Sequence, residues 1–278
     1  MLFDSHAHIN NDTYTREDRE ALIRDIEASD LSYVMDIGFD LKSSRLAAEH
    51  ARTYPWCYAA AGVHPHDADT MTEEVLSEIR TLAGEEKVKA IGEIGLDFHY
   101  DRSERDAQEY WFRRQIRLAN EMRIPIVIHS RDADKKTMDI LKEEGAFSEE
   151  RCGWFPARGG AGDARVLLHC FSGSRELGQQ YVKLGREYVK LGATLSIAGP
   201  ITYKNNRKTV EMAEDIPIEY LLVETDSPYL TPVPFRGRPN KSPYVEHTVR
   251  RLALIKGVTY EEAARRTMEN AKVFFDIK

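Results

Sequence analysis

Two histidines close the first apolar stretch of the chain, at His6 and His8 in the opening MLFDSHAHIN. In an extended strand, residues i and i+2 point to the same face, so both imidazoles project side by side. Imidazole is a common ligand for zinc, manganese, iron, cobalt and nickel. The spacing predicts that both histidines reach one metal ion. The alternative is a polar pair that simply ends a strand, and the rest of the chain has to decide between them.

Polar side chains also follow other short apolar runs. They are His64 in GVHP, Glu93 in GEIGLD, His129 after IPIVI, His169 after VLL, and Asp226 in ETDSP. Each one alone is compatible with a hydrogen-bonded polar group in a core, but burying several such groups is costly unless they have partners. A metal centre explains all of them together.

Histidine, glutamate and aspartate form a mixed nitrogen and oxygen ligand set, which suits zinc, manganese or iron better than calcium. A carboxylate can bridge two cations, and Glu93 is the expected bridge. Two cations about 3.5–4 Å apart can activate a water molecule and clamp a phosphoryl oxygen. Asp226 can ligate a metal and accept a proton from the attacking water.

The elements that must position these residues alternate along the chain. Strands are predicted over 2–7, 32–38, within 56–65, and over 88–97, 124–129, 164–171, 187–197 and 219–226. Helices are predicted over 16–28, 42–54, 72–83, 104–122, 132–144, near 174–185, near 205–214, and over 243–256 and 259–275.

Eight strands that alternate with helices imply a parallel sheet. The runs IVI, VLL and LLV do not alternate with polar residues, which is typical of strands buried on both faces. We therefore expect an α/β fold, a (β/α)8 TIM barrel as one domain over 1–278, with the metal centre at the carboxyl ends of the strands. An open doubly wound sheet is the alternative, but no G-x-G-x-x-G follows an early strand.

Composition narrows the class of protein. The net charge of −7 over 278 residues argues against an extended basic surface for long duplex nucleic acid. Three cysteines without a C-x-x-C motif favour a reducing compartment. No apolar run reaches 18 residues, and the first residues lack the pattern of a signal peptide. We expect a cytoplasmic protein that does not enter membranes. The glycine- and arginine-rich stretch 148–164 is expected to be a mobile surface insertion, with partner binding as the alternative.

Six blocks in this order resemble the TatD family of metal-dependent deoxyribonucleases, a branch of the amidohydrolase superfamily. The blocks are DSHAHI, GVHP, GEIGLD, IHSRDA, LHCFSG and ETDSP, followed by an N-A-x-x-F ending at 270–274. The resemblance implies hydrolysis of phosphodiester bonds in DNA, often from the 3′ end, with two divalent ions of zinc, manganese or magnesium.

The resemblance also assigns roles to single residues. His6 and His8 match ligands of the first metal, which Glu93 and Asp226 complete, and Glu93 is shared between the two metals. His129 and His169 match ligands of the second metal. His64 matches a histidine near the substrate phosphate, so the expected catalytic residues are Asp226, Glu93 and His64.

Basic residues in loops expected at the carboxyl ends of the strands are candidate substrate contacts. They are Arg131, Lys204, Arg236 and Arg238. Their positive charge beside an otherwise acidic surface favours single-stranded or frayed 3′ ends of DNA over intact duplex. Tyr203, Tyr229 and Phe235 are possible stacking surfaces for unpaired bases, and solvated charges with packing aromatics are the alternative.

Two other functions stay open at this point. The same metal centre could hydrolyse another ester or an amide, such as D-aminoacyl-tRNA. Many such enzymes bridge their metals with a carboxylated lysine after the fourth strand, whereas Glu93 takes that place here. A non-catalytic scaffold is the other alternative, and it would not need an intact ligand set.

Overall fold

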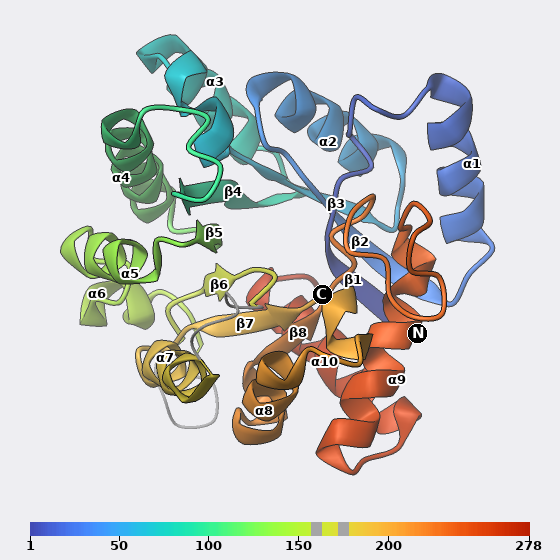
Figure 1. Ribbon diagram of the computed structural model, residues 1–278. Helices are drawn as coiled ribbons and strands as arrows, with labels where there is room; N and C mark the ends of the chain where they lie inside the picture. The colour runs from blue at the N-terminus through green and yellow to red at the C-terminus, as the bar shows by residue number, and fades with distance from the viewer. Residues whose placement is uncertain (157–162, 172–177) are drawn as a thin grey trace. The chain divides into compact units, whose positions relative to one another are not determined.

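The computed structural model describes residues 1–156, 163–171 and 178–278, in which parallel strands alternate with helices (Figure 1). The strands are β1 (Leu2–Ala7), β2 (Leu31–Ile37), β3 (Cys57–Ala61), β4 (Val88–Asp97), β5 (Ile126–Arg131), β6 (Val166–Leu168), β7 (Thr194–Ile197) and β8 (Leu221–Val223). The longer helices are α1 (Arg16–Glu27), α2 (Leu41–Thr53), α3 (Glu73–Ala83), α4 (Arg105–Met122), α5 (Asp134–Glu143), α7 (Gly178–Lys190), α8 (Arg207–Asp215), α9 (Val245–Lys256) and α10 (Tyr260–Phe274).

Short helical turns complete the chain: α6 (Glu149–Gly153), η1 (Pro65–Thr70), η2 (Gly199–Thr202), η3 (Ile218–Tyr220) and η4 (Ser242–Tyr244). Among the described residues, no helix is long and apolar enough to cross a membrane.

The chain divides into two compact units. The first unit comprises Met1–Asp36, His169–Val189 and Thr194–Lys278, and the second comprises Ile37–Leu168 and Lys190–Ala193. In the first unit, β7 pairs with β8 and β1 with β2, and a bridge between Ala7 and Ser227 joins the end of β1 to the segment after β8. In the second unit, β3, β4, β5 and β6 pair in sequence order. All of these pairings are parallel, as predicted, and the single domain over 1–278 stays a prediction.

Buried strands and capped helices explain why these elements form. All six residues of β1 are buried, although Asp4, Ser5 and His6 are polar, so this strand is covered on both faces. Thr15 caps α1 by a reciprocal hydrogen-bonded box with Asp18, which satisfies backbone N–H groups that a helix leaves unpaired at its start. The polar residues of β1 are therefore held inside the first unit and must find partners there.

The structure corrects several predicted boundaries. Glu187–Lys190 lies in α7, whereas the sequence pattern predicts the start of a strand there. The sixth and eighth strands have three residues each, so His169 and Asp226 follow their strands instead of ending them. His129 lies within β5, which continues to Arg131.

The stretch predicted as a surface insertion begins with a buried contact. Arg151 in α6 is fully buried, and its guanidinium donates to the carbonyl oxygens of Ala164 at 2.7 Å and Ile124 at 2.9 Å. It also donates to the side-chain oxygen of Asn120 at 2.6 Å. Burial lowers the pKa of Arg151 to about 10. The start of the stretch is therefore part of the second unit's interior, whereas residues 157–162 lie outside the described residues.

Glycine at position 95 allows β4 to approach β5 closely. Gly95 pairs with His129 and has φ of +148°, a backbone conformation that other residues rarely adopt. A Cβ atom built at this position would lie 1.9 Å from the carbonyl oxygen of His129. The glycine therefore fixes the place of His129 relative to the end of β4.

We predict that Gly95→Ala lowers the free energy of unfolding by about 3 kcal/mol, because the added methyl group forces the two backbones apart. Gly153→Ala is the matched control, since a Cβ there meets no atom of the described residues within 4 Å. We expect the control to stay within about 0.5 kcal/mol of the wild type in urea unfolding. Equal unfolding midpoints for the two variants would contradict the close approach.

Candidate metal centre

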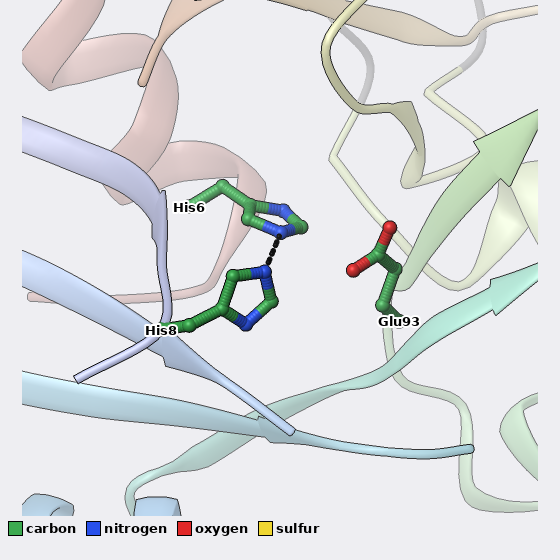
Figure 2. Close-up of side chains that lie close together, drawn as sticks. All are labelled: His6, His8 and Glu93. Atoms are coloured by element: carbon green, nitrogen blue, oxygen red, sulfur yellow. Dashed lines mark hydrogen bonds between the residues drawn. The ribbon is translucent and has the colours of Figure 1, made fainter. Parts of the chain in front are cut away.

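Three side chains converge at the end of β1 in the first unit. Figure 2 shows the rings of His6 and His8, whose Nε2 atoms lie 3.3 Å apart. Oδ1 of Asp226 lies 3.8 Å from Nε2 of His6 and 3.5 Å from Nε2 of His8. Two donors bound at ~2.1 Å to one ion are about 3.0–3.4 Å apart, so these spacings fit three ligands of a single cation after a small contraction.

The backbone holds Asp226 against β1. Its N–H donates to the carbonyl oxygen of His6 at 2.9 Å, and the N–H of His8 donates to the carbonyl oxygen of Ser227 at 2.9 Å. Asp226 has φ of +54°, in the left-handed region that aspartate adopts more readily than most residues. These hydrogen bonds bring the segment after β8 beside the end of β1, which explains how residues 220 positions apart meet.

Histidines keep the carboxyl group of Asp226 ionised. Burial opposes ionisation, but the hydrogen bond from His8 and the charges of His6 and His169 outweigh it and lower the pKa of Asp226. A carboxylate surrounded by imidazoles in this way is suited to a cation. The chemistry of the donor set therefore agrees with its geometry.

Asp4 contacts the backbone next to His6 and Asp226 and is not one of the three converging side chains. Its carboxylate accepts from the N–H of Thr225 at 2.8 Å and from the hydroxyl of Thr225 at 2.6 Å, and it lies 3.4 Å from the N–H of His6. Burial raises the pKa of Asp4 to about 7. Asp4 thus ties β1 to the segment that carries Asp226.

A second acidic residue, Glu224, holds the segment around His169. It accepts from the N–H of Cys170 at 2.6 Å and from the hydroxyl of Ser196, and its Oε1 lies 3.5 Å from Nδ1 of His169. The ring of His169 stacks on that of His6 with centroids 4.0 Å apart. His6, His169 and Glu224 also offer three donor atoms within 4.8 Å of one another, so this face of the first unit presents a continuous set of ligands.

The second unit holds another cluster, at the ends of β4 and β5. Nδ1 of His129 lies 3.0 Å from Oε1 of Glu93, and Nε2 of His129 lies 3.1 Å from Oδ2 of Asp97. A neutral imidazole carries only one proton, so it can donate to only one of these carboxylates. A protonated ring could donate to both. If His129 instead held a cation together with Glu93 through Nδ1, its Nε2–H would donate to Asp97, as in the carboxylate–histidine–metal triads that orient many metal ligands.

Asp97 gathers four donors. Besides His129, it accepts from Nε2 of His66 at 2.9 Å and from the N–H groups of His99 at 3.0 Å and Tyr100 at 2.8 Å. Burial raises the pKa of Asp97, but the hydrogen bonds from His129, His66 and Tyr100 outweigh it and hold the pKa well below its usual range. Asp97 is therefore an ionised anchor for the ring of His129.

His64 lies in the same cluster, but its Nδ1 has a different partner from that of His129. Its Nδ1 accepts from the N–H of His66 at 3.1 Å, so a neutral His64 carries its proton on Nε2. That Nε2 lies 3.6 Å from Oε1 of Glu93. A protonated nitrogen cannot ligate a metal, although His64, Glu93 and His129 offer donor atoms within 4.8 Å of one another. The geometry makes His64 a hydrogen-bond donor beside Glu93.

The candidate substrate contacts lie in both units, and all four are exposed: Arg131 in the second unit, and Lys204, Arg236 and Arg238 in the first. The guanidinium of Arg131 lies 4.5 Å from the ring of Tyr100, and that of Arg236 lies 4.3 Å from the ring of Tyr203. Their roles stay predictions.

Three residues of these clusters are not predicted from the sequence. Glu224 directly follows the apolar run LLV, the same signal that identifies His129 and His169. His66 repeats the i, i+2 spacing of His6 and His8 by following His64. The hydroxyl of Ser196 gives no signal, because its role depends on the pairing of β7 with β8.

Comparisons with known proteins identify the family of the chain. The family model described as TatD related DNase matches residues 3–276. The uncharacterized metal-dependent hydrolase YabD of Bacillus subtilis (strain 168) is 44% identical over 277 residues, covering 100% of each chain. The 3′-5′ ssDNA/RNA exonuclease TatD of Salmonella typhimurium is 32% identical over 283 residues, covering 99% of each chain.

Among solved structures, YJJV, a TatD homologue from Escherichia coli K12, superposes with a TM-score of 0.84 and 24% identity, covering 100% of this chain and 98% of that one. A TatD family hydrolase from Entamoeba histolytica gives a TM-score of 0.82 and 20% identity, covering 100% and 98%. These likenesses confirm the (β/α)8 barrel class, and the relatives confirm the predicted class of enzyme, a metal-dependent hydrolase. The family match spans nearly all of the chain, which belongs to the TatD related DNase family.

Proposed function

We propose that this protein is a metal-dependent phosphodiesterase that acts on DNA, as a 3′-5′ exonuclease that prefers single-stranded ends. The observation that carries the proposal is the pair of clusters in which imidazole nitrogens face ionised or buried carboxylates, at Asp226 and at Glu93. The relative from Salmonella typhimurium, named a 3′-5′ ssDNA/RNA exonuclease, supports the type of bond and the direction.

The proposal includes two divalent ions of zinc, manganese or magnesium. His6, His8 and Asp226 would hold the first ion, His129 and His169 would hold the second, and Glu93 would be shared. The spacing of donors within each unit supports grouping His8 with Asp226 and His129 with Glu93, and the rest of this division rests on the resemblance to the family. When bound, such ions supply an activated water and neutralise charge on a phosphoryl oxygen.

The protein's own residues then have distinct tasks. Asp226 accepts the proton of the attacking water, because its carboxyl is ionised by the histidines around it. The Nε2–H of His64 donates a hydrogen bond to a phosphate oxygen of the substrate, which its tautomer supports. Asp97 keeps the ring of His129 oriented by accepting the Nε2 proton.

Substrate preference follows from charge. Arg131, Lys204, Arg236 and Arg238 contribute exposed positive groups, whereas the chain as a whole carries a net charge of −7. A small positive region attracts the few phosphates of a frayed or single-stranded end, and the acidic remainder repels long duplexes. We further propose that 1–278 acts as one domain in the cytoplasm, which the three cysteines without a C-x-x-C motif support.

Our first activity prediction concerns the carboxylates. Glu93→Gln and Asp226→Asn should each lower cleavage of a 5′-labelled single-stranded DNA oligonucleotide by about 1000-fold, since each removes a charged group from the reacting site. Glu121→Gln, at an exposed position on α4, is the control and should cleave like the wild type. A chelator should stop cleavage, and Mn²⁺, Mg²⁺ or Zn²⁺ should restore a ladder that shortens from the 3′ end.

If folded, metal-loaded wild-type protein leaves both DNA and RNA oligonucleotides intact, the proposal is wrong as to substrate. Another ester is then the next hypothesis, and D-aminoacyl-tRNA is the first such substrate to test.

Our second prediction separates a metal ligand from a substrate contact. His64→Gln should retain the metal content of the wild type and lower kcat by about 100-fold, because it removes a donor and no ligand. His129→Gln should lose bound metal. Elemental analysis of the dialysed proteins measures the first quantity, and cleavage kinetics measure the second. Loss of metal from His64→Gln would mean that Nε2 of His64 is a ligand after all.

A further inference from the structure

Tyr100, Arg102 and Arg131 form a group of positive and aromatic side chains next to the cluster of Glu93, His129 and Asp97 in the second unit. The guanidinium of Arg131 lies 4.5 Å from the ring centre of Tyr100, and that of Arg102 lies 5.6 Å from it. All three side chains are exposed, and Tyr100 keeps 51% of its surface accessible. The ring therefore contacts both guanidinium groups by cation–π interactions without burying them.

These two arginines differ from most others of the second unit. Arg45, Arg52, Arg80, Arg105, Arg113, Arg114, Arg117 and Arg165 each form an ion pair with a carboxylate. Neither Arg102 nor Arg131 has a carboxylate partner within the ranges that the structure describes.

The carboxylates nearest in sequence are already engaged. Asp101 pairs with Arg105, and Asp132 lies 2.9 Å from Nδ1 of His99. Arg102 and Arg131 thus keep their charge and their donors available for an anion from solution.

The group is rigidly connected to the metal cluster. The N–H of Tyr100 donates to Asp97 at 2.8 Å, and Asp97 pairs with Arg131 in the register of β4 and β5. Arg131 follows His129 by two residues on β5, so the two side chains point to the same face of the strand. Glu93 contacts His129, His129 contacts Asp97, and Asp97 contacts Tyr100. The group of Tyr100, Arg102 and Arg131 therefore lies outside the shell of proposed metal ligands.

We propose that Arg102, Arg131 and Tyr100 form a binding site for a second, non-scissile phosphate of a single-stranded nucleic acid. The two guanidinium groups bind the phosphate oxygens, and Tyr100 holds them in place before the substrate arrives. This inference rests on the proposed function and deepens it. It explains how an acidic protein retains a strand between successive cleavages, and it predicts that substrates with a single phosphodiester lack this interaction.

The test compares two substrates and two variants. The substrates are octathymidylate and the dinucleotide TpT, which has one phosphodiester and no other phosphate. The variants are Arg102→Gln/Arg131→Gln and the control Arg123→Gln. Arg123 is also exposed, also lies over an aromatic ring, with its guanidinium 5.6 Å from the ring of Trp154, and also has no carboxylate partner among the described residues. It lies before β5 instead of at its end.

We expect the double variant to lose roughly tenfold in kcat/KM on octathymidylate at 0.15 M salt, with kcat/KM on TpT within about twofold of the wild type. The slope of log affinity against log salt for an uncleavable phosphorothioate octamer should become shallower by about 0.7, because the site binds one phosphate and each single-strand phosphate contact contributes about that much. Arg123→Gln should match the wild type in every measurement.

The outcomes separate the two proposals. If the wild type cleaves and binds the octamer but the double variant keeps its salt slope, the phosphate site is wrong and the exonuclease proposal stands. An equal loss on TpT and octathymidylate also overturns the site, because the arginines then act on the scissile phosphate or on folding. If the wild type neither binds nor cleaves either substrate, both proposals fall together.

Discussion

Buried carboxylates need positive or hydrogen-bonding partners, and this requirement determines which side chains surround the carboxylates of both clusters. Glu93 is 4% exposed, and Asp97 and Glu224 are fully buried. A buried carboxylate without a counter-charge or several hydrogen bonds costs several kcal/mol. Asp97 meets this demand with two imidazoles and two backbone N–H groups. Glu93 faces the nitrogens of His129 and His64, and a cation held by Glu93 and Nδ1 of His129 would balance the charge of Glu93 and leave the other nitrogen to donate to Asp97.

The fold supplies these groups from strands, as at His6, Glu93 and His129, and from segments that follow strands, as at His169 and Asp226. In the first unit, backbone hydrogen bonds from Asp226 to His6 and from His8 to Ser227 bring the segment after β8 beside β1. In the second unit, Gly95 lets β4 approach β5 at His129. These backbone contacts form without a bound cofactor. For this reason a substitution at Gly95 should lower stability, whereas a substitution at His129 should affect metal binding.

The sequence predicts elements where one signal is unambiguous. The strand over 88–97 has the predicted limits, and α4 begins one residue after the predicted start. The prediction of a strand over 187–190 is wrong because the sequence EYVK is compatible with a strand or with the end of a helix. Only packing decides between the two. Polar residues after apolar runs give six candidate ligands, which lie in the clusters of the two units, and their role as metal ligands stays a prediction. They cannot show that Glu224 binds Cys170 and Ser196, because those contacts depend on which strands pair.

The sequence also does not show which partner each ring nitrogen faces. His64 and His129 are the same residue type in similar motifs, yet one accepts a backbone proton at Nδ1 and the other directs Nδ1 at a carboxylate. This difference follows from the turn after His64, where η1 begins and directs the N–H of His66 at Nδ1 of His64. A local backbone turn thus distinguishes the proposed hydrogen-bond donor from the proposed metal ligand.

The central claim is that each cluster holds a cation at a stated nitrogen. Anomalous diffraction from crystals of the wild-type protein grown with Mn²⁺ tests it most directly. We predict one peak ~2.2 Å from Nε2 of His6 and of His8, and a second at a similar distance from Nδ1 of His129. A second peak at Nε2 of His129, between that ring and Asp97, or the absence of any peak at His6 and His8, would contradict the account.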